Sequence, residues 1–102
     1  MKIPNSLKPE IERTIDAFNA KHDCKYAARY KGQFLYLGRN EGSQKPSPIC
    51  RLLFTGNIEK WEFAIYKYST QSYDPDEWFF PGEQYVNGTI EGAMMAGLEA
   101  YA

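Results

Sequence analysis

The segment WEFAIYKYS, residues 61–69, carries the most information about the fold of this chain. Alternate side chains of an extended strand point to opposite faces, so Phe63 and Ile65 share one face while Tyr66 lies on the other. A strand with large apolar groups on both faces needs cover on both, because water solvates neither. One face can pack in the core. The other requires a second segment, a second copy of the chain or a ligand.

The composition is that of one globular domain spanning residues 1–102. The chain is 43% hydrophobic and 16% aromatic by residue. A chain of this length buries roughly 60–65% of the surface that its unfolded form exposes, which suffices for one core and not for two. The sequence contains no internal repeat and no linker. We therefore expect a single domain.

Opposite charges nearly balance in this sequence. There are 12 basic and 13 acidic residues, and the formal net charge is −1. Such a chain has no long-range positive field, so DNA is not an expected partner and RNA would require a local basic patch. No window approaches the roughly 18 apolar residues of a membrane span, and the N-terminal residues lack an apolar signal core. We expect a soluble cytoplasmic protein that does not bind membranes.

Two helical patterns flank the middle of the chain. Near the N-terminus, Ile11, Ile15 and Phe18 recur at the spacing of one helix face. The second pattern runs from about residue 89 to residue 101 and is rich in small residues. Its two interior glycines cost about 1 kcal/mol each relative to alanine. Their presence predicts that the backbone of this helix closely approaches the sheet or the other helix.

Four strand patterns lie between the helices, at about 25–31, 33–39, 48–55 and 61–69. The short connections between them favour antiparallel pairing of successive strands. We therefore predict an α+β fold in the order α-β-β-β-β-α. Its four-stranded antiparallel meander sheet carries the N- and C-terminal helices packed on one face.

Side-chain parity assigns the two faces of this sheet. A turn at residues 31–32 places Tyr26 opposite Leu37, and the third hairpin places Leu52 opposite Phe63. We expect the two helices to pack on the apolar face that results. The opposite face, called the reverse face below, mixes aromatic and charged groups. Its predicted members are Arg29, Phe34, Tyr36, Arg51, Leu53, Glu62, Ala64, Tyr66 and Tyr68.

The reverse face is the first candidate binding surface. A solvated sheet face is normally polar, so its rings require an explanation. The candidate contact residues are Arg29, Phe34, Tyr36, Arg51, Tyr66 and Tyr68.

The aromatic loop at residues 70–82 is the second candidate. Its large side chains are Tyr73, Trp78, Phe79 and Phe80. Rings in a proline-bounded loop must be buried against something. We expect the loop to fold back over the edge or the reverse face of the sheet, and a partner-facing role is the alternative.

No residue pattern supports catalysis or a cofactor. His22, the single histidine, falls on the apolar stripe of the first helix, where packing accounts for it. Asp74 and Glu77 fit a helix cap better than a cation site. Cys24 and Cys50 have no zinc or thioredoxin spacing. We expect no catalytic residue, metal ligand or cofactor.

Three classes of function remain. The leading hypothesis is a non-catalytic protein-interaction module that self-associates, as a homodimer, or binds a protein partner through the reverse face or the aromatic loop. Aromatic and arginine side chains are enriched at the centres of such interfaces. The second hypothesis is binding of single-stranded RNA on the reverse face, with rings stacking on bases. The third is a small molecule held under the 70–82 loop.

The C-terminal part of the chain also resembles a group of short, uncharacterised bacterial proteins. The resemblance covers about half of the chain and is carried by the segments 61–69, 73–78, 88–93 and 96–101. It implies a bacterial cytoplasmic origin. It transfers no activity and no catalytic residue.

Overall fold

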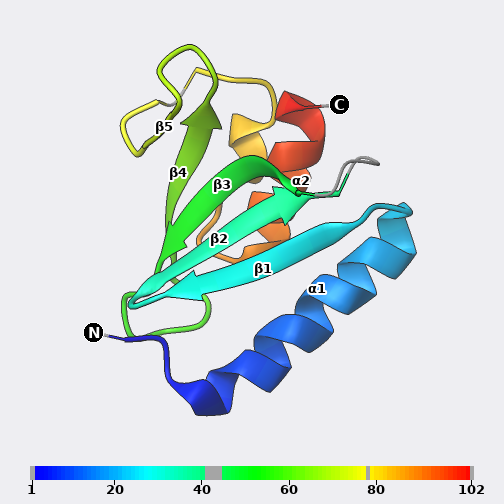
Figure 1. Ribbon diagram of the computed structural model, residues 1–102, viewed down its shortest axis with the longest axis vertical. Helices are drawn as coiled ribbons and strands as arrows, with labels where there is room; N and C mark the ends of the chain where they lie inside the picture. The colour runs from blue at the N-terminus through cyan, green and yellow to red at the C-terminus, as the bar shows by residue number, and fades with distance from the viewer. Residues whose placement is uncertain (1, 41–44, 78, 102) are drawn as a thin grey trace.

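The computed structural model describes residues 2–40, 45–77 and 79–101, which form two α-helices and a five-stranded sheet (Figure 1). A 3₁₀ turn at Asn5–Leu7 leads into helix α1, Lys8–His22. The strands are β1 Tyr26–Lys31, β2 Phe34–Arg39, β3 Ser47–Leu53, β4 Glu62–Lys67 and β5 Ser72–Asp74. A second 3₁₀ turn, Glu83–Tyr85, precedes helix α2, Ile90–Ala100.

The sheet is an antiparallel meander in which each strand pairs with the next, in the order β1-β2-β3-β4-β5. The predicted α+β class and the positions of the two helices are confirmed. The predicted number of four strands is wrong, because part of the aromatic loop forms β5. Gln71 adopts a left-handed φ of 52° and turns the chain back along β4. Tyr73 thereby lies opposite Tyr66.

The β1–β2 register differs by two residues from the predicted one. Tyr26 lies opposite Arg39 rather than Leu37. The reason is the turn, which is formed by Gly32, with a φ of 62°, and the residue after it. A shift of two residues preserves side-chain parity, so each side chain keeps its predicted face. The predicted β3–β4 register is confirmed.

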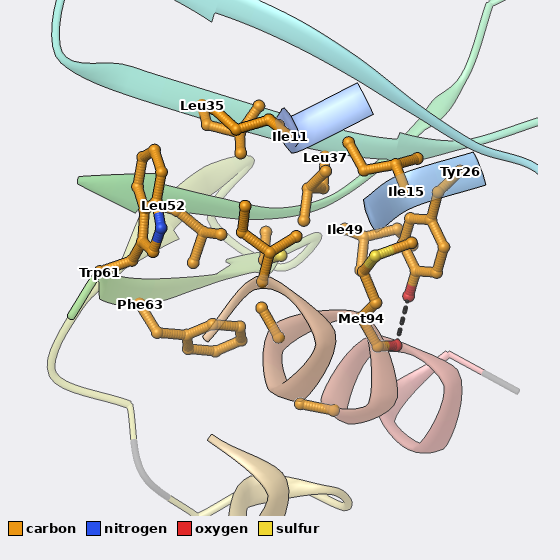
Figure 2. Packing of buried hydrophobic residues seen from close by; sticks show 14 of the residues in the cluster. Ile11, Ile15, Tyr26, Leu35, Leu37, Ile49, Leu52, Trp61, Phe63 and Met94 are labelled. Carbon is orange, nitrogen blue, oxygen red and sulfur yellow. Dashed lines mark hydrogen bonds between the residues drawn. The ribbon is translucent and has the colours of Figure 1, made fainter. Parts of the chain in front are cut away.

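Both helices pack on one face of the sheet. The helices contribute buried side chains to the core, namely Ile11, Ile15, Phe18, Ile90, Ala93, Met94 and Ala96. The strands contribute Leu35, Leu37, Cys50, Leu52, Phe63 and Ile65 to the same cluster. Figure 2 shows part of this cluster, with Ile11, Ile15 and Met94 of the helices facing Leu35, Leu37, Leu52 and Phe63 of the sheet. Each large side chain fully buried in this way stabilises the fold by about 1.5–3 kcal/mol.

Helix α2 lies close to the sheet because it carries small residues. A Cβ atom at Gly97 would lie 2.5 Å from Cγ2 of Ile49 and would also overlap the hydroxyl of Tyr26. That hydroxyl donates a hydrogen bond of 2.7 Å to the carbonyl of Met94 (Figure 2). The buried Arg39 donates to the Gly97 carbonyl, at the end of the helix where a cation is favoured. The close approach predicted from the interior glycines is confirmed.

We expect Gly97→Ala to lower the free energy of unfolding by about 1–3 kcal/mol, because the added methyl group overpacks the contact with β1 and β3. The substitution improves helix propensity by about 1 kcal/mol, so at an open site it would stabilise the protein. Urea denaturation of the variant and of Glu99→Ala, an exposed control on the same helix, measures the difference. Stabilisation by Gly97→Ala would contradict the packing described here.

Candidate functional site

One row of side chains crosses the reverse face from strand to strand. Arg29 lies opposite Tyr36, and Tyr36 lies opposite Arg51. Arg51 in turn lies opposite Ala64. Ala64 is only 3% exposed, although both helices pack on the other side of the sheet. On this side of the sheet, the ring centroids of Tyr36 and Tyr73 lie 5.4 Å apart.

The rings of the reverse face form a connected series that ends at the C-terminal helix. The centroid of Tyr73 lies 5.0 Å from that of Tyr66, which lies 4.8 Å from that of Tyr68. Tyr68 in turn lies 5.5 Å from Tyr101. These pairs are edge to face, a geometry that contributes about 0.5–1.5 kcal/mol per pair beyond burial. The hydroxyl of Tyr101 donates to the carbonyl of Tyr66, which fixes the end of α2 to β4.

Two arginines lie over the faces of these rings. The guanidinium carbon of Arg29 is 4.8 Å from the centroid of Tyr36. That of Arg51 is 4.5 Å from the centroid of Phe34 and 5.5 Å from that of Tyr73. Cations at these distances are attracted to the negative ring face. The stacking holds both cations on the sheet and covers ring faces that would otherwise be open.

The reverse face remains partly open to solvent. Its half-buried members are Phe34, Tyr36, Arg51, Leu53, Tyr66 and Tyr73. Arg29 is exposed, and Tyr68 retains 50% of its accessible surface. Burial raises the pKa of the Tyr73 hydroxyl, so this group stays a neutral hydrogen-bond donor at physiological pH. The arrangement offers rings, hydroxyl groups and two cations on one surface.

The six side chains proposed from the sequence for this face do lie together. Two further residues join them that the sequence analysis did not place there. Tyr73 was assigned to the loop, and its position follows from the unpredicted β5. Tyr101 closes the predicted C-terminal helix, which runs from about residue 89 to residue 101. Its aromatic character was visible in the sequence, but its contact with Tyr68 depends on where α2 ends.

The two halves of the aromatic loop pack on different sides of the sheet. As expected, β5 extends the sheet edge and places Tyr73 on the reverse face, whereas Phe80 packs on the helix side. The ring of Phe80 stacks on that of Phe63, a core residue, with centroids 5.8 Å apart and an interplanar angle of 20°. Gly82 then passes so close to α2 that a Cβ atom would lie 2.8 Å from Cβ of Glu99. Phe79 points outward and is 92% exposed. Trp78, the remaining predicted ring, lies outside the described residues.

An ion pair holds the start of this loop against β4. Nζ of Lys67 lies 3.0 Å from Oε2 of Glu77 and 3.7 Å from Oδ2 of Asp74. The other carboxylate oxygen of Glu77 accepts the backbone N–H of Phe79. The bond from Lys67 lowers the pKa of Glu77, and the same bond raises the pKa of Lys67. These contacts fix the turn from which Phe79 projects.

The remaining reactive groups are engaged in packing. The His22 ring lies against Phe18, with centroids 4.2 Å apart. Burial raises the pKa of the Cys50 thiol, so its nucleophilic thiolate form is disfavoured. Within the described part of the chain, no three histidine, cysteine, aspartate or glutamate side chains are grouped closely enough to hold a metal ion.

Comparison of the chain with protein-family models, curated proteins and solved structures finds no significant match. Across residues 2–40, 45–77 and 79–101, no helix has the length and apolar character that a membrane crossing requires. Function must therefore be inferred from the site itself.

The two adjacent phenylalanines of the loop should respond differently to truncation. We expect Phe80→Ala to lower the free energy of unfolding by about 1–3 kcal/mol, because it removes a ring stacked on the core. Phe79→Ala should change it by less than about 0.5 kcal/mol, since the ring is exposed. Chemical denaturation of both variants measures the contrast. Equal destabilisation by the two substitutions would contradict the loop geometry.

Proposed function

We propose that this domain is a non-catalytic protein-binding module that self-associates through its reverse face. The observation that carries the proposal is the half-exposed cluster of rings and arginines on a sheet face that neither helix covers. Tyrosine and arginine are the side chains most enriched at the energetic centres of protein interfaces. No catalytic role is assigned to any residue.

The reverse face is also preorganised for binding. Tyr66, for example, is held between the rings of Tyr68 and Tyr73 in the isolated chain. Immobilising a free side chain on association costs about 0.5–1.5 kcal/mol. Rings that already contact one another lose less freedom on docking. A larger share of the free energy gained by burying these rings therefore contributes to binding affinity.

A second copy of the chain is the partner that the charges favour. The net charge of −1 gives two copies little mutual repulsion. The face carries Arg29 on β1 and Glu62 on β4, both exposed, and neither belongs to an ion pair with another described residue. A two-fold interface uses the same patch on both subunits, so each contact occurs twice. Such packing can pair Arg29 of each copy with Glu62 of the other.

Binding of single-stranded RNA is the alternative for the same surface. It would use the rings as stacking platforms and the arginines as phosphate contacts. The faces of Phe34 and Tyr36 are already occupied by guanidinium groups, which leaves less ring surface for bases. Glu62 also adds a negative charge to the face. Both observations favour a protein partner.

We expect light scattering during size-exclusion chromatography to give about twice the chain mass of 11.8 kDa. Arg29→Glu and Glu62→Arg should each weaken the dimer about tenfold or more, because like charges then meet across the interface. Combining them should restore dimerisation, since the swapped charges again attract. Asp16→Arg and Lys60→Glu, exposed positions outside the reverse face, serve as charge-matched controls.

A monomeric mass for the unmodified chain up to about 1 mM would refute self-association, because even weak interfaces assemble at that concentration. A titration with polyuridine at two salt concentrations tests the alternative. Saturable binding that weakens steeply with added salt would favour RNA over a second copy.

A further inference from the structure

A cavity of about 360 Å³ opens on the reverse face between β1, β2 and the segment leading into β3. Small-molecule sites typically enclose roughly 300–1,000 Å³, so its size suits a small ligand. Its floor exists because two small residues, Ala27 and Gly38, lie opposite each other on β1 and β2. The next positions on this face, Arg29 on β1 and Tyr36 on β2, carry large side chains, so the two small residues leave a hollow beside them.

The wall of the cavity depends on the same glycine. A Cβ atom at Gly38 would lie 2.9 Å from Cβ of Pro46 and 3.2 Å from the carbonyl oxygen of Ser47. The register shift after Leu37 brings Gly38 opposite Pro48. Pro46 and Pro48 can therefore fold closely over the end of β2 and form a rigid apolar wall.

The opposite wall is aromatic and the rim is cationic. Tyr36 and Tyr73 line the cavity with rings tilted by 62° to each other. Arg29 lies over the Tyr36 ring, and Lys45 is a second lining residue. No carboxylate is found among the described lining residues. Apolar walls with a few convergent charged groups are the usual design of a ligand site.

We propose that this cavity binds a small planar anion. The ring of the ligand packs between the prolines and the two tyrosines, while its carboxylate or phosphate group meets Arg29 at the rim. Arginine suits this role because its planar fork of donors matches both anions. The site differs from the 70–82 loop considered from the sequence, since Tyr73 is its only described lining residue from that segment. It also goes beyond self-association, although it shares Arg29, Tyr36 and Tyr73 with the proposed interface.

Isothermal titration calorimetry with four probes tests the proposal. Benzoate and uridine monophosphate each combine a ring with an anion, and their relative affinities distinguish carboxylate from phosphate ligands. Uridine supplies a ring without charge, and inorganic phosphate supplies charge without a ring. We expect at least one of the first two probes to bind with a Kd below about 1 mM. The two partial probes should bind at least about tenfold more weakly.

Two substitutions locate the binding. Arg29→Gln removes the cation and Ala27→Leu fills the floor, and each should weaken binding about tenfold or more. Lys31→Gln, on the same strand and face but outside the lining, should leave binding unchanged. Far-ultraviolet circular dichroism checks that each variant is folded. If Ala27→Leu disturbs the sheet, the result for Arg29→Gln decides the test.

The proposal is overturned if no probe saturates by about 10 mM, if phosphate alone binds as tightly as the nucleotide, or if binding survives both substitutions. Light scattering on the same samples separates this result from the proposed dimer. A monomer that binds a probe would refute self-association and support the cavity. A dimer that binds none of the probes would support self-association and refute the proposed ligand site.

Discussion

Strand β4 must be buried on both faces, whereas the helices formed by the described residues cover only one. Phe63 and Ile65 enter the core beneath α1 and α2. Ala64 points the other way and is nearly inaccessible. On the same side of the sheet, Tyr36 of β2 and Tyr73 of β5 approach each other to 5.4 Å between ring centroids. The reverse face thus covers its own centre with rings, and the outer surfaces of those rings remain available to a partner.

Much of the fold could be predicted because side-chain parity survives errors in register. The β1–β2 hairpin is displaced by two residues from its predicted pairing, yet every side chain stays on its expected face. The order of the elements and the β3–β4 register followed from apolar alternation and short connections. The small residues of the last helix likewise indicated its close approach to the sheet. These features depend on local patterns, which a sequence displays directly.

The rest depends on conformations that the sequence does not display. Strand β5 spans three residues and requires a left-handed Gln71, a residue type that carries no turn signal. Phe79 and Phe80 look alike in the sequence, but one is exposed and the other stacks on the core. The cavity requires Gly38 to meet both β1 and the segment before β3, which is a consequence of the register shift. In each case the outcome depends on contacts between residues in the folded structure, which their spacing along the sequence does not reveal.

Photochemically induced nuclear polarisation of the tyrosines can detect self-association through the reverse face, because the excited dye reacts only with accessible rings. At low protein concentration, Tyr68 should give a strong signal and the buried Tyr26 none, since their exposed fractions are 50% and 5%. As the concentration rises, the Tyr68 signal should fall while that of Tyr85, a half-buried ring away from the sheet face, persists. A Tyr68 signal that is independent of concentration would contradict the account of the reverse face as a self-association surface.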